Sequence, residues 1–361
     1  MDLPDPASRH PLRAVPRAGA IAILLALIAI LAWSSIAVPR LAAETASSEA
    51  HETAGEGGST GDFALYTHIH QRVATGESYY AAALAEQRAG NYPTRPFVTV
   101  RLPTLAWLNA ALGPPVVRGA LLTLLLATAA ALYMRTRVVL GVPQAAAGAF
   151  LLLLGGAGVM ADQASVIHEL VAGLLLSLTL VLHRSERWWP SLALAALALA
   201  VRELALPFVL LWLAFALGQR RWREAAAVGA VLALFAAGLW AHYLAVTALL
   251  LPIDQTSPGW QAFAGPALPL LSLARMSALL VLPLWLAGPL AVLALLGWFG
   301  LGGRTGLFAG LWFTGFFLAM ALFARPENTY WVMLVLPAYL AGLAWAPRAL
   351  RDLFRAAATR R

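Results

Sequence analysis

The sequence predicts an all-α protein of about ten transmembrane segments, with one long loop that carries short interfacial helices. Hydrophobic residues make up 61% of the 361 residues, and the mean hydropathy is +0.75. Soluble domains are nearer half apolar. The excess lies in runs of Leu, Ala, Val and Phe that approach the roughly 20 residues that one membrane-spanning helix needs. We therefore expect residues 1–361 to form a single transmembrane domain.

Ten apolar runs give the elements in order. They are residues 19–37, 116–134, 141–160, 166–182, 190–201, 204–217, 225–249, 277–300, 306–323 and 331–346. The fifth and sixth are too short to cross a bilayer alone, and they meet at Arg202 and Glu203. We expect two helices that turn back inside the membrane, where such a turn must be buried in protein or line a wet cavity. The first run followed by "RLAAET" could instead be a signal peptide, but its length favours retention.

The basic residues predict the orientation of the chain. All 25 are Arg, and sixteen of them fall on one side when the runs alternate across the membrane. That side includes the N-terminal tail, 1–18, and the basic C-terminal tail, 347–361. The positive-inside rule places both tails in the cytoplasm, in the inner (cytoplasmic) membrane. The net charge of +8 is then a topology signal, and we expect no nucleic-acid partner.

The one long loop, residues 38–115, falls on the extracytoplasmic side. Residues 43–61 are small, polar and acidic, which indicates a flexible segment. Residues 62–112 contain many aromatic side chains and indicate ordered short helices near the membrane surface. A helix that begins at Asp62 would place one acid, two aromatic rings and two aliphatic groups on a single face. These residues are Asp62, Tyr66, Ile69, His70 and Val73.

The order of features in this loop supports a family resemblance. "GDFALYTHIHQRVATGESYY" (61–80) is followed by "YPTRP" (92–96) and by "RLPTLAWLNAALG" (101–113). This order resembles the first outer loop of the GT-C type glycosyltransferases, such as those that use dolichyl- or undecaprenyl-phosphate-linked mannose or arabinose. The resemblance extends more loosely to "VIHELVAGLLLSLTL" (166–180) and to residues 200–225.

The resemblance implies a sugar transfer from a polyprenyl-phosphate carrier to a lipid or glycan acceptor of the cell envelope, with inversion. The acceptor hydroxyl must lose a proton, which suits a carboxylate general base, and the matching acid of the loop is Asp62. The leaving phosphate suits a fixed guanidinium group, and the matching residue is Arg101. The partners would be the lipid-linked donor, the acceptor and membrane lipids.

Further polar residues on the same side are candidates to bind the carrier phosphate or the substrate. They are Arg95, Tyr66, Asp162, His168, Glu169, Arg202, Glu203, Arg325 and Glu327. Members of the superfamily differ in whether they use a divalent metal. Asp62, Asp162 and His168 are candidate ligands, although no spacing here is diagnostic of a metal site, so no cofactor is assigned.

Structural roles remain open for the same side chains. Asp62 is also a favoured helix N-cap, Arg101 could reach lipid phosphates by snorkelling, and Arg202–Glu203 could be a structural ion pair. At the level of the whole protein, a transporter or a flippase of lipid-linked sugars is the main alternative, because short broken helices also occur in transporters. A non-catalytic membrane scaffold is the third hypothesis.

Overall fold

The computed structural model describes residues 10–53, 62–259 and 263–359, and within them the side chains of residues 48–53 and of Asp62 are not described. Every regular element in these ranges is a helix, and the one β-type pairing there is an isolated bridge between Arg95 and Thr256. The prediction of an all-α protein is confirmed.

Five helices are long and apolar enough to cross a membrane. They are α1 (Arg17–Thr53), α5 (Pro114–Leu140), α10 (Trp222–Thr247), α12 (Leu284–Leu301) and α13 (Gly303–Phe323). Shorter apolar helices accompany them: α6 (Val142–Gly155), α7 (His168–Leu182), α8 (Trp189–Val201), α9 (Leu206–Gly218) and α11 (Ala267–Met276). The structure therefore has about half the predicted number of full-length spans.

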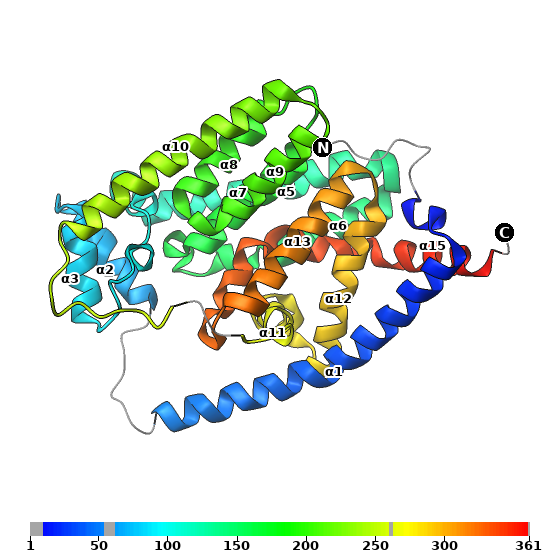
Figure 1. Cartoon of the computed structure of the whole chain (residues 1–361), viewed down its shortest axis with the longest axis horizontal. Coiled ribbons are helices and arrows are strands. Elements are labelled where there is room, and N and C mark those ends of the chain that lie inside the picture. Colours follow the sequence, from blue (N-terminus) through cyan, green and yellow to red (C-terminus); the bar gives the residue numbers. More distant parts are fainter. Residues whose placement is uncertain (1–9, 54–61, 260–262, 360–361) are drawn as a thin grey trace.

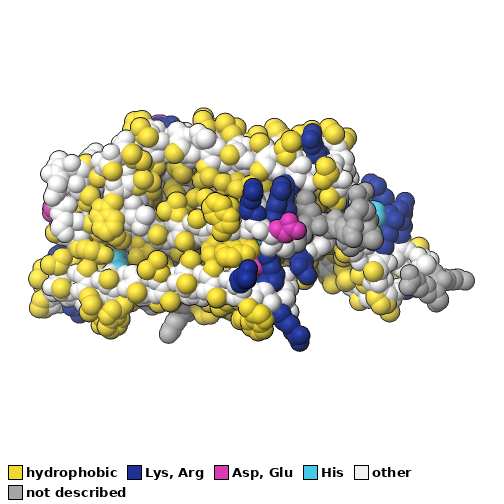
Figure 2. All heavy atoms as spheres, turned by 90° about the horizontal axis from the view of Figure 1, so that it is seen from above, with side chains coloured by type: hydrophobic (Ala, Val, Ile, Leu, Met, Phe, Trp, Pro, Cys, Tyr) yellow, Lys and Arg dark blue, Asp and Glu magenta, His cyan; other side chains and the backbone are white. Residues whose placement is uncertain are grey.

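The outside of the molecule has the apolar character that a lipid environment requires. Leu25, Leu234 and Val281 expose 63%, 76% and 79% of their surface, and many other large apolar residues are exposed along the same helices. Soluble monomers rarely expose contiguous apolar patches of this extent. Figure 2 shows a face that is mostly hydrophobic, on which Arg side chains gather to the right of the centre.

Several predicted boundaries change because helix-breaking residues interrupt the apolar runs. α1 continues past residue 43, where the sequence predicts a flexible segment, to Thr53, and residues 54–61 lie outside the described residues. The run 277–300 gives a 3₁₀ turn, η7 (Ala278–Val281), and then α12, which begins after Pro283. Proline favours the start of a helix because it lacks the backbone N–H that would need a partner.

The last predicted run, 331–346, is not one continuous α-helix. It consists of η8 (Pro326–Leu334), α14 (Leu336–Tyr339) and η9 (Leu340–Ala344), followed by α15 (Ala346–Ala358). Pro337 breaks the hydrogen-bond ladder there, and most residues of the segment are buried. The segment packs on α6, α7 and α12, so it lies inside the helical core and not on the surface that would face lipid.

Glycines allow this central segment to lie against its neighbours backbone to backbone. A Cβ on Gly297 of α12 would overlap the carbonyl of Gly342, and one on Gly173 of α7 would overlap the carbonyl of Met333. Small residues at such crossings are typical of helix packing in membranes.

The region that the sequence assigns to the ordered loop forms a small unit at one end of the molecule. It contains α2 (Asp62–Ala74), α3 (Tyr79–Ala89), η3 (Phe97–Thr99) and α4 (Thr104–Leu112). Leu65, Ile69 and Leu84 form its core together with Val246 of α10. Figure 1 shows α2 and α3 at the end of the molecule opposite to α15.

Candidate functional site

A polar cavity of about 600 Å³ lies where the α2–α4 unit meets the helical core. Its walls come from four parts of the chain: α2 and α3, the residues between Tyr92 and Arg101, the α8–α9 turn, and the segment from Arg325 to Trp331. Ser257 and Gly259 line it from the loop after α10. We call this space the arginine cavity, because Arg101, Arg202 and Arg325 all line it.

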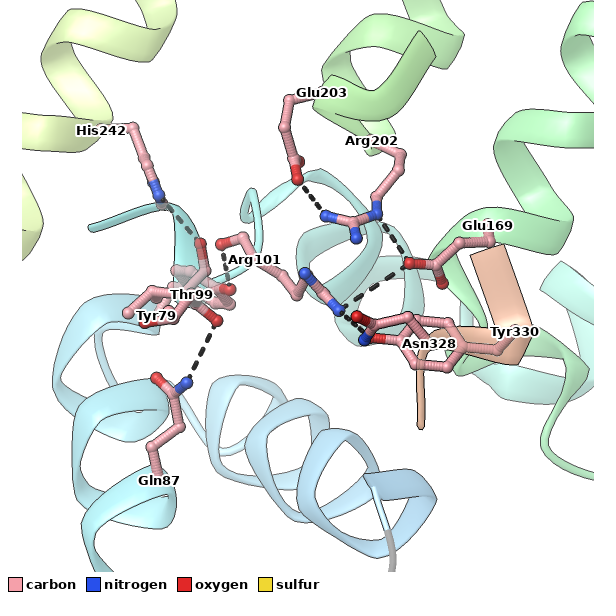
Figure 3. A network of polar contacts seen from close by, with 11 residues as sticks. Tyr79, Gln87, Thr99, Arg101, Glu169, Arg202, Glu203, His242, Asn328 and Tyr330 are labelled. Atoms are coloured by element: carbon pink, nitrogen blue, oxygen red, sulfur yellow. Dashed lines mark hydrogen bonds and ion pairs between the residues drawn. The ribbon is translucent and has the colours of Figure 1, made fainter. Parts of the chain in front are cut away.

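The backbone that carries Arg101 is held in place by side chains from other elements. Residues 100–102 run between η3 and α4, and the Val100 N–H donates to the Phe97 carbonyl at the end of η3 (3.1 Å). Three side chains bond to consecutive carbonyl oxygens: Gln87 Nε2 donates to Thr99 O (3.2 Å), His242 Nε2 donates to Val100 O (3.1 Å) and Tyr79 Oη donates to Arg101 O (2.6 Å). Figure 3 shows these three contacts around the strand-like stretch. Burial raises the pKa of the Tyr79 phenol above its usual value, so it remains a donor.

Glu169 stands between two guanidinium groups. Its Oε1 lies 2.7 Å from Nε of Arg202 and 3.8 Å from Nη2 of Arg101. Arg202 also pairs with the neighbouring Glu203, so two carboxylates surround one buried guanidinium. Figure 3 shows Arg101 and Arg202 reaching Glu169 from different sides. Buried charges require such partners, because desolvation of an unpaired charge costs several kcal/mol.

Two of the three guanidinium groups have an Nε without a hydrogen-bond partner among the described residues. Arg101 Nη2 donates to Tyr330 Oη at 3.2 Å, but its Nε is buried and has no hydrogen-bond partner among the described residues. Arg325 is likewise unpaired at Nε, which lies 4.0 Å from the exposed carboxylate of Glu327. Charged donors that face a cavity favour an anion, and a guanidinium binds phosphate with fixed geometry.

The cavity brings together most of the residues that the sequence singles out. Tyr66, Arg101, Arg202, Arg325 and Glu327 line it. Glu169 and Glu203 join it through their ion pairs with Arg202. His168 lies behind Tyr66, with the ring centroids 5.2 Å apart.

Two predicted residues lie elsewhere. The Arg95 guanidinium donates to the Leu251 carbonyl at 3.0 Å, and Arg95 is not part of the cavity lining. Asp162 has a side chain that is 88% exposed, pairs with Arg118 at 3.0 Å and lines a different cavity. Tyr66 and His70 lie one turn apart in α2, as the sequence predicts, but His70 lines that second cavity and not the arginine cavity.

The proposed general base cannot be placed atom by atom. Asp62 is the first residue of α2, one turn before Tyr66, and its side chain lies outside the described residues. Because Tyr66 lines the arginine cavity, the first turn of α2 lies near that cavity.

Several contributors were missed in the sequence. Tyr79, Gln87 and His242 position Arg101, while Tyr330 contacts it directly and Asn328 Oδ1 accepts from the Arg325 backbone N–H at 3.0 Å. They come from segments up to 229 residues apart, and no local spacing connects them. The only available signal was the pair of aromatic residues Tyr79-Tyr80, which the resemblance included without a role.

The loop after α10 closes one side of the cavity and is clamped to α3. Arg88 forms a bidentate pair with Asp254, with N–O distances of 2.7 and 2.9 Å. This hydrogen-bonded guanidinium lowers the pKa of the Asp254 carboxyl to about 2. The clamp positions Ser257 and Gly259 at the wall of the arginine cavity.

An apolar groove of about 540 Å³ adjoins the same stretch of backbone. It is lined by Leu102, Pro103 and Trp107 on one side and by residues of α8 and α10, such as Leu199 and Leu234, on the other. Arg101 and Leu102 are consecutive, yet the first lines the arginine cavity and the second lines the groove. A charged binding site and an apolar one therefore lie side by side.

The candidate metal ligands do not lie together in the part of the chain that the structure describes. Among the residues that the structure describes, no three His, Asp or Glu side chains come together as metal ligands would. Asp162 and His168 each have other contacts, with Arg118 and with Tyr66.

A comparison with known proteins finds no family model, no curated protein and no solved structure that matches this chain.

Proposed function

We propose that the protein is an integral-membrane glycosyltransferase of the GT-C type, which transfers a sugar from a polyprenyl-phosphate carrier to an envelope lipid or glycan. The observation that carries the proposal is the pairing of two sites at residues 101 and 102. Arg101 and Arg325 line one cavity, each with an Nε that has no hydrogen-bond partner among the described residues, and Leu102, which follows Arg101, lines an apolar groove. A phosphate head with a long hydrocarbon tail needs both surfaces at once.

The groove suits the tail because it is apolar and lies on the outer surface of the helices. Its wall on α10 includes Leu234, which is among the most exposed large apolar residues of the chain. A tail lying there would pass from the bilayer to the cavity without crossing a polar surface. Arg101 would then hold the phosphate at the boundary between the two spaces.

The proposed reaction is a single displacement at the anomeric carbon. The oxygen of an acceptor hydroxyl forms a bond to this carbon while the bond from the carbon to the phosphate oxygen breaks. The hydroxyl proton passes to the Asp62 carboxylate, and the polyprenyl phosphate leaves with its charge opposite Arg101 and Arg325. Attack from the face opposite to the leaving group inverts the anomeric configuration.

The orientation is part of the proposal. The α2–α4 unit and the arginine cavity would lie on the extracytoplasmic side of the inner membrane, and α15 would lie in the cytoplasm. The distribution of Arg supports this, because exposed Arg184 and Arg187 lie in the turn before α8, and exposed Arg220 and Arg223 lie just before α10 and in its first turn.

The test is an activity assay with the Asp62→Asn variant. Membranes that contain the wild type or the variant are supplied with labelled polyprenyl-phosphate sugars, and transfer to membrane lipids and glycans is followed. Asn keeps the size and much of the capping ability of Asp but cannot accept the proton, so we expect a loss of at least about 100-fold. Glu44→Gln, a change at an exposed carboxylate, is the control and should retain activity. Equal transfer by Asp62→Asn and wild type would contradict the assignment of the base.

A flippase or transporter of lipid-linked sugars is the second candidate. The buried Arg202 at the turn between the short helices α8 and α9 favours it, since ionisable groups and broken helices also mark transport pathways. Movement of the labelled donor across vesicle membranes without transfer, unchanged in Asp62→Asn, would support this candidate over the transferase.

A further inference from the structure

A second cavity, of about 340 Å³, lies on the other side of α2 from the arginine cavity. Thr67, His70, Gln71 and Ala74 line it, and their spacing of three, four and seven residues defines one face of the helix. The opposite walls come from Asn109 of α4 and from the loop between α6 and α7. Helix α2 therefore separates two cavities.

Two residues that line this second cavity each have a buried polar atom without a hydrogen-bond partner among the described residues. His70 is 5% exposed and its Nδ1 is unpaired, and Asn109 is 3% exposed and its Oδ1 is unpaired. The Asn109 amide nitrogen is already used, because it donates to the carbonyls of Leu105 and Ser165, both at 2.9 Å. This contact fixes the amide so that its oxygen is the atom left free. An unmade buried hydrogen bond costs about 1–3 kcal/mol, which a polar ligand would recover.

The lining indicates the chemical class of the ligand. Seven of the ten lining residues are polar, and they are Thr67, His70, Gln71, Asn109, Asp162, Gln163 and Ser165. No Arg is among the lining residues, and the Asp162 carboxylate, which does line the cavity, is paired with Arg118 at 3.0 Å. Burial lowers the pKa of His70 to about 4, so its ring is neutral at pH 7. The site therefore lacks the positive charge that an anion would need, and its polar side chains are set in an otherwise apolar lining.

We propose that the cavity between α2, α4 and the α6–α7 loop binds a neutral saccharide unit. A sugar presents several hydroxyl groups within one ring, each able to donate to Asn109 Oδ1 or the Asp162 carboxylate and to pair with His70 Nδ1. The cavity volume lies in the usual range for small-molecule sites. This inference goes beyond the proposed function, since it names a second site and does not require that the arginine cavity be catalytic.

The test uses the purified full-length protein in lipid nanodiscs. The probes are methyl α-glycosides of glucose, mannose and galactose, and saturation-transfer NMR measures their binding. Ala74→Trp should block the cavity, because Ala74 is exposed at its wall and carries no hydrogen bond of the core. The matched control is Thr75→Trp, which places the same ring one residue later, outside the lining.

The expected result is saturable binding of at least one glycoside by the wild type, weakened at least tenfold by Ala74→Trp and retained by Thr75→Trp. His70→Phe should weaken binding to a similar degree, since it keeps a ring but removes both nitrogens. Arg101→Gln should leave binding unchanged, which separates this site from the arginine cavity. The proposal is overturned if no glycoside binds saturably, or if Ala74→Trp, shown to be folded by gel filtration, binds as the wild type does. Binding of inorganic phosphate in place of the glycosides would equally overturn it.

Discussion

At the scale of single residues, Glu169 lies where a neutral side chain would leave two buried guanidinium groups without their shared carboxylate. Its carboxylate is buried between Arg101 and Arg202, and only a charged acid balances them there. Loss of one partner of a buried ion pair leaves an uncompensated charge in a place of low polarity.

We predict that Glu169→Gln lowers the free energy of unfolding by about 3–5 kcal/mol. The control is Glu327→Gln, because the Glu327 side chain is 71% exposed and its pair with Arg325 is long. Changes at such exposed pairs are about 0–1 kcal/mol. The measurement is thermal unfolding in detergent, followed by tryptophan fluorescence. Equal melting temperatures of Glu169→Gln and Glu327→Gln would mean that the ion pairs of Glu169 with Arg101 and Arg202 do not stabilise the fold.

A second residue-scale prediction concerns pH. His70 has a pKa of about 4 in the folded protein, compared with the ordinary value of 6.5. Between pH 6.5 and pH 4 the unfolded chain therefore binds a proton at this residue, while the folded chain does not. The free energy of unfolding consequently falls as the pH drops from about 6.5 to 4. Above pH 6.5 this residue does not change it. At pH 5 this difference is roughly 2 kcal/mol.

The check is thermal unfolding at pH 7.5 and pH 5. We expect a smaller loss of stability at pH 5 for His70→Gln than for the wild type. The variant keeps Asp162, which lines the same cavity, and it removes the His70 ring together with the effect of that ring on the pKa of His168. An identical pH response of the two proteins would show that His70 is not buried as a neutral group.

The sequence singles out residues whose type is costly at their position, and the structure brings three of them together. Arg101, Arg202 and Arg325 are charged groups next to apolar runs, and they meet in one cavity. Arg95 failed to join them because its guanidinium satisfies the backbone of a loop more than 150 residues away. Gln87, Tyr79 and Tyr330 act through tertiary contacts, which no local pattern in the sequence records.

At the scale of elements, the crossing of α12 with the central segment depends on glycine. Gly297 and Gly342 allow the two backbones to touch, and a side chain on either would meet a carbonyl group. Gly229 in α10, by contrast, has no neighbouring atom near the position of an added Cβ.

We predict opposite outcomes for the same substitution at these two sites. Gly297→Ala should destabilise the protein by about 1–3 kcal/mol or more, because it overpacks a crossing of two rigid backbones. Gly229→Ala should be neutral or stabilising by up to about 1 kcal/mol, from the gain in helix propensity. Melting temperatures of the two variants test this, and a stable Gly297→Ala would contradict the packing of α12 on η9.

Element types were easier to predict from the sequence than element lengths. Apolar runs located nearly every core helix. An apolar segment in lipid must satisfy its backbone hydrogen bonds within itself, so it forms a helix. α11 was missed because Pro266, Pro269 and a polar face interrupt its short run. The segment 331–346 was taken for a span because composition cannot distinguish a lipid-facing helix from a broken, protein-buried one.

At the scale of the whole molecule, the two ends of the long axis carry different chemistry. The α2–α4 unit and both polar cavities lie at one end, and α15 lies at the other with His10 and Arg13 paired to Asp352. The proposal requires a membrane between these ends.

The chain contains no cysteine, so single introduced cysteines can report the side of the membrane directly. We predict that Thr75→Cys in intact cells reacts with a membrane-impermeant maleimide, while Ala358→Cys reacts only after the membrane is opened. Both positions are exposed. Labelling of both in intact cells, or of Ala358→Cys alone, would contradict the proposed topology.

The sequence predicted a membrane protein because this class depends on composition, which the apolar helices of the structure reflect. It did not predict that the loop folds into a unit which shares a core residue, Val246, with α10, since this needs contacts across more than 150 residues. The apolar groove beside Arg101 was also invisible in the sequence, because its two walls come from α4 and from α8 and α10.

The central claim is that the arginine cavity holds the phosphate of a lipid carrier. The most direct measurement is the affinity of the purified protein in nanodiscs for farnesyl phosphate, compared among the wild type, Arg101→Gln and the control Arg275→Gln. Arg275 is an exposed arginine of α11 outside the cavity lining. A lost charge-assisted contact costs about 1.5–3 kcal/mol, so Arg101→Gln should bind at least tenfold more weakly, while Arg275→Gln should match the wild type. Equal affinity of Arg101→Gln and the wild type would contradict the claim.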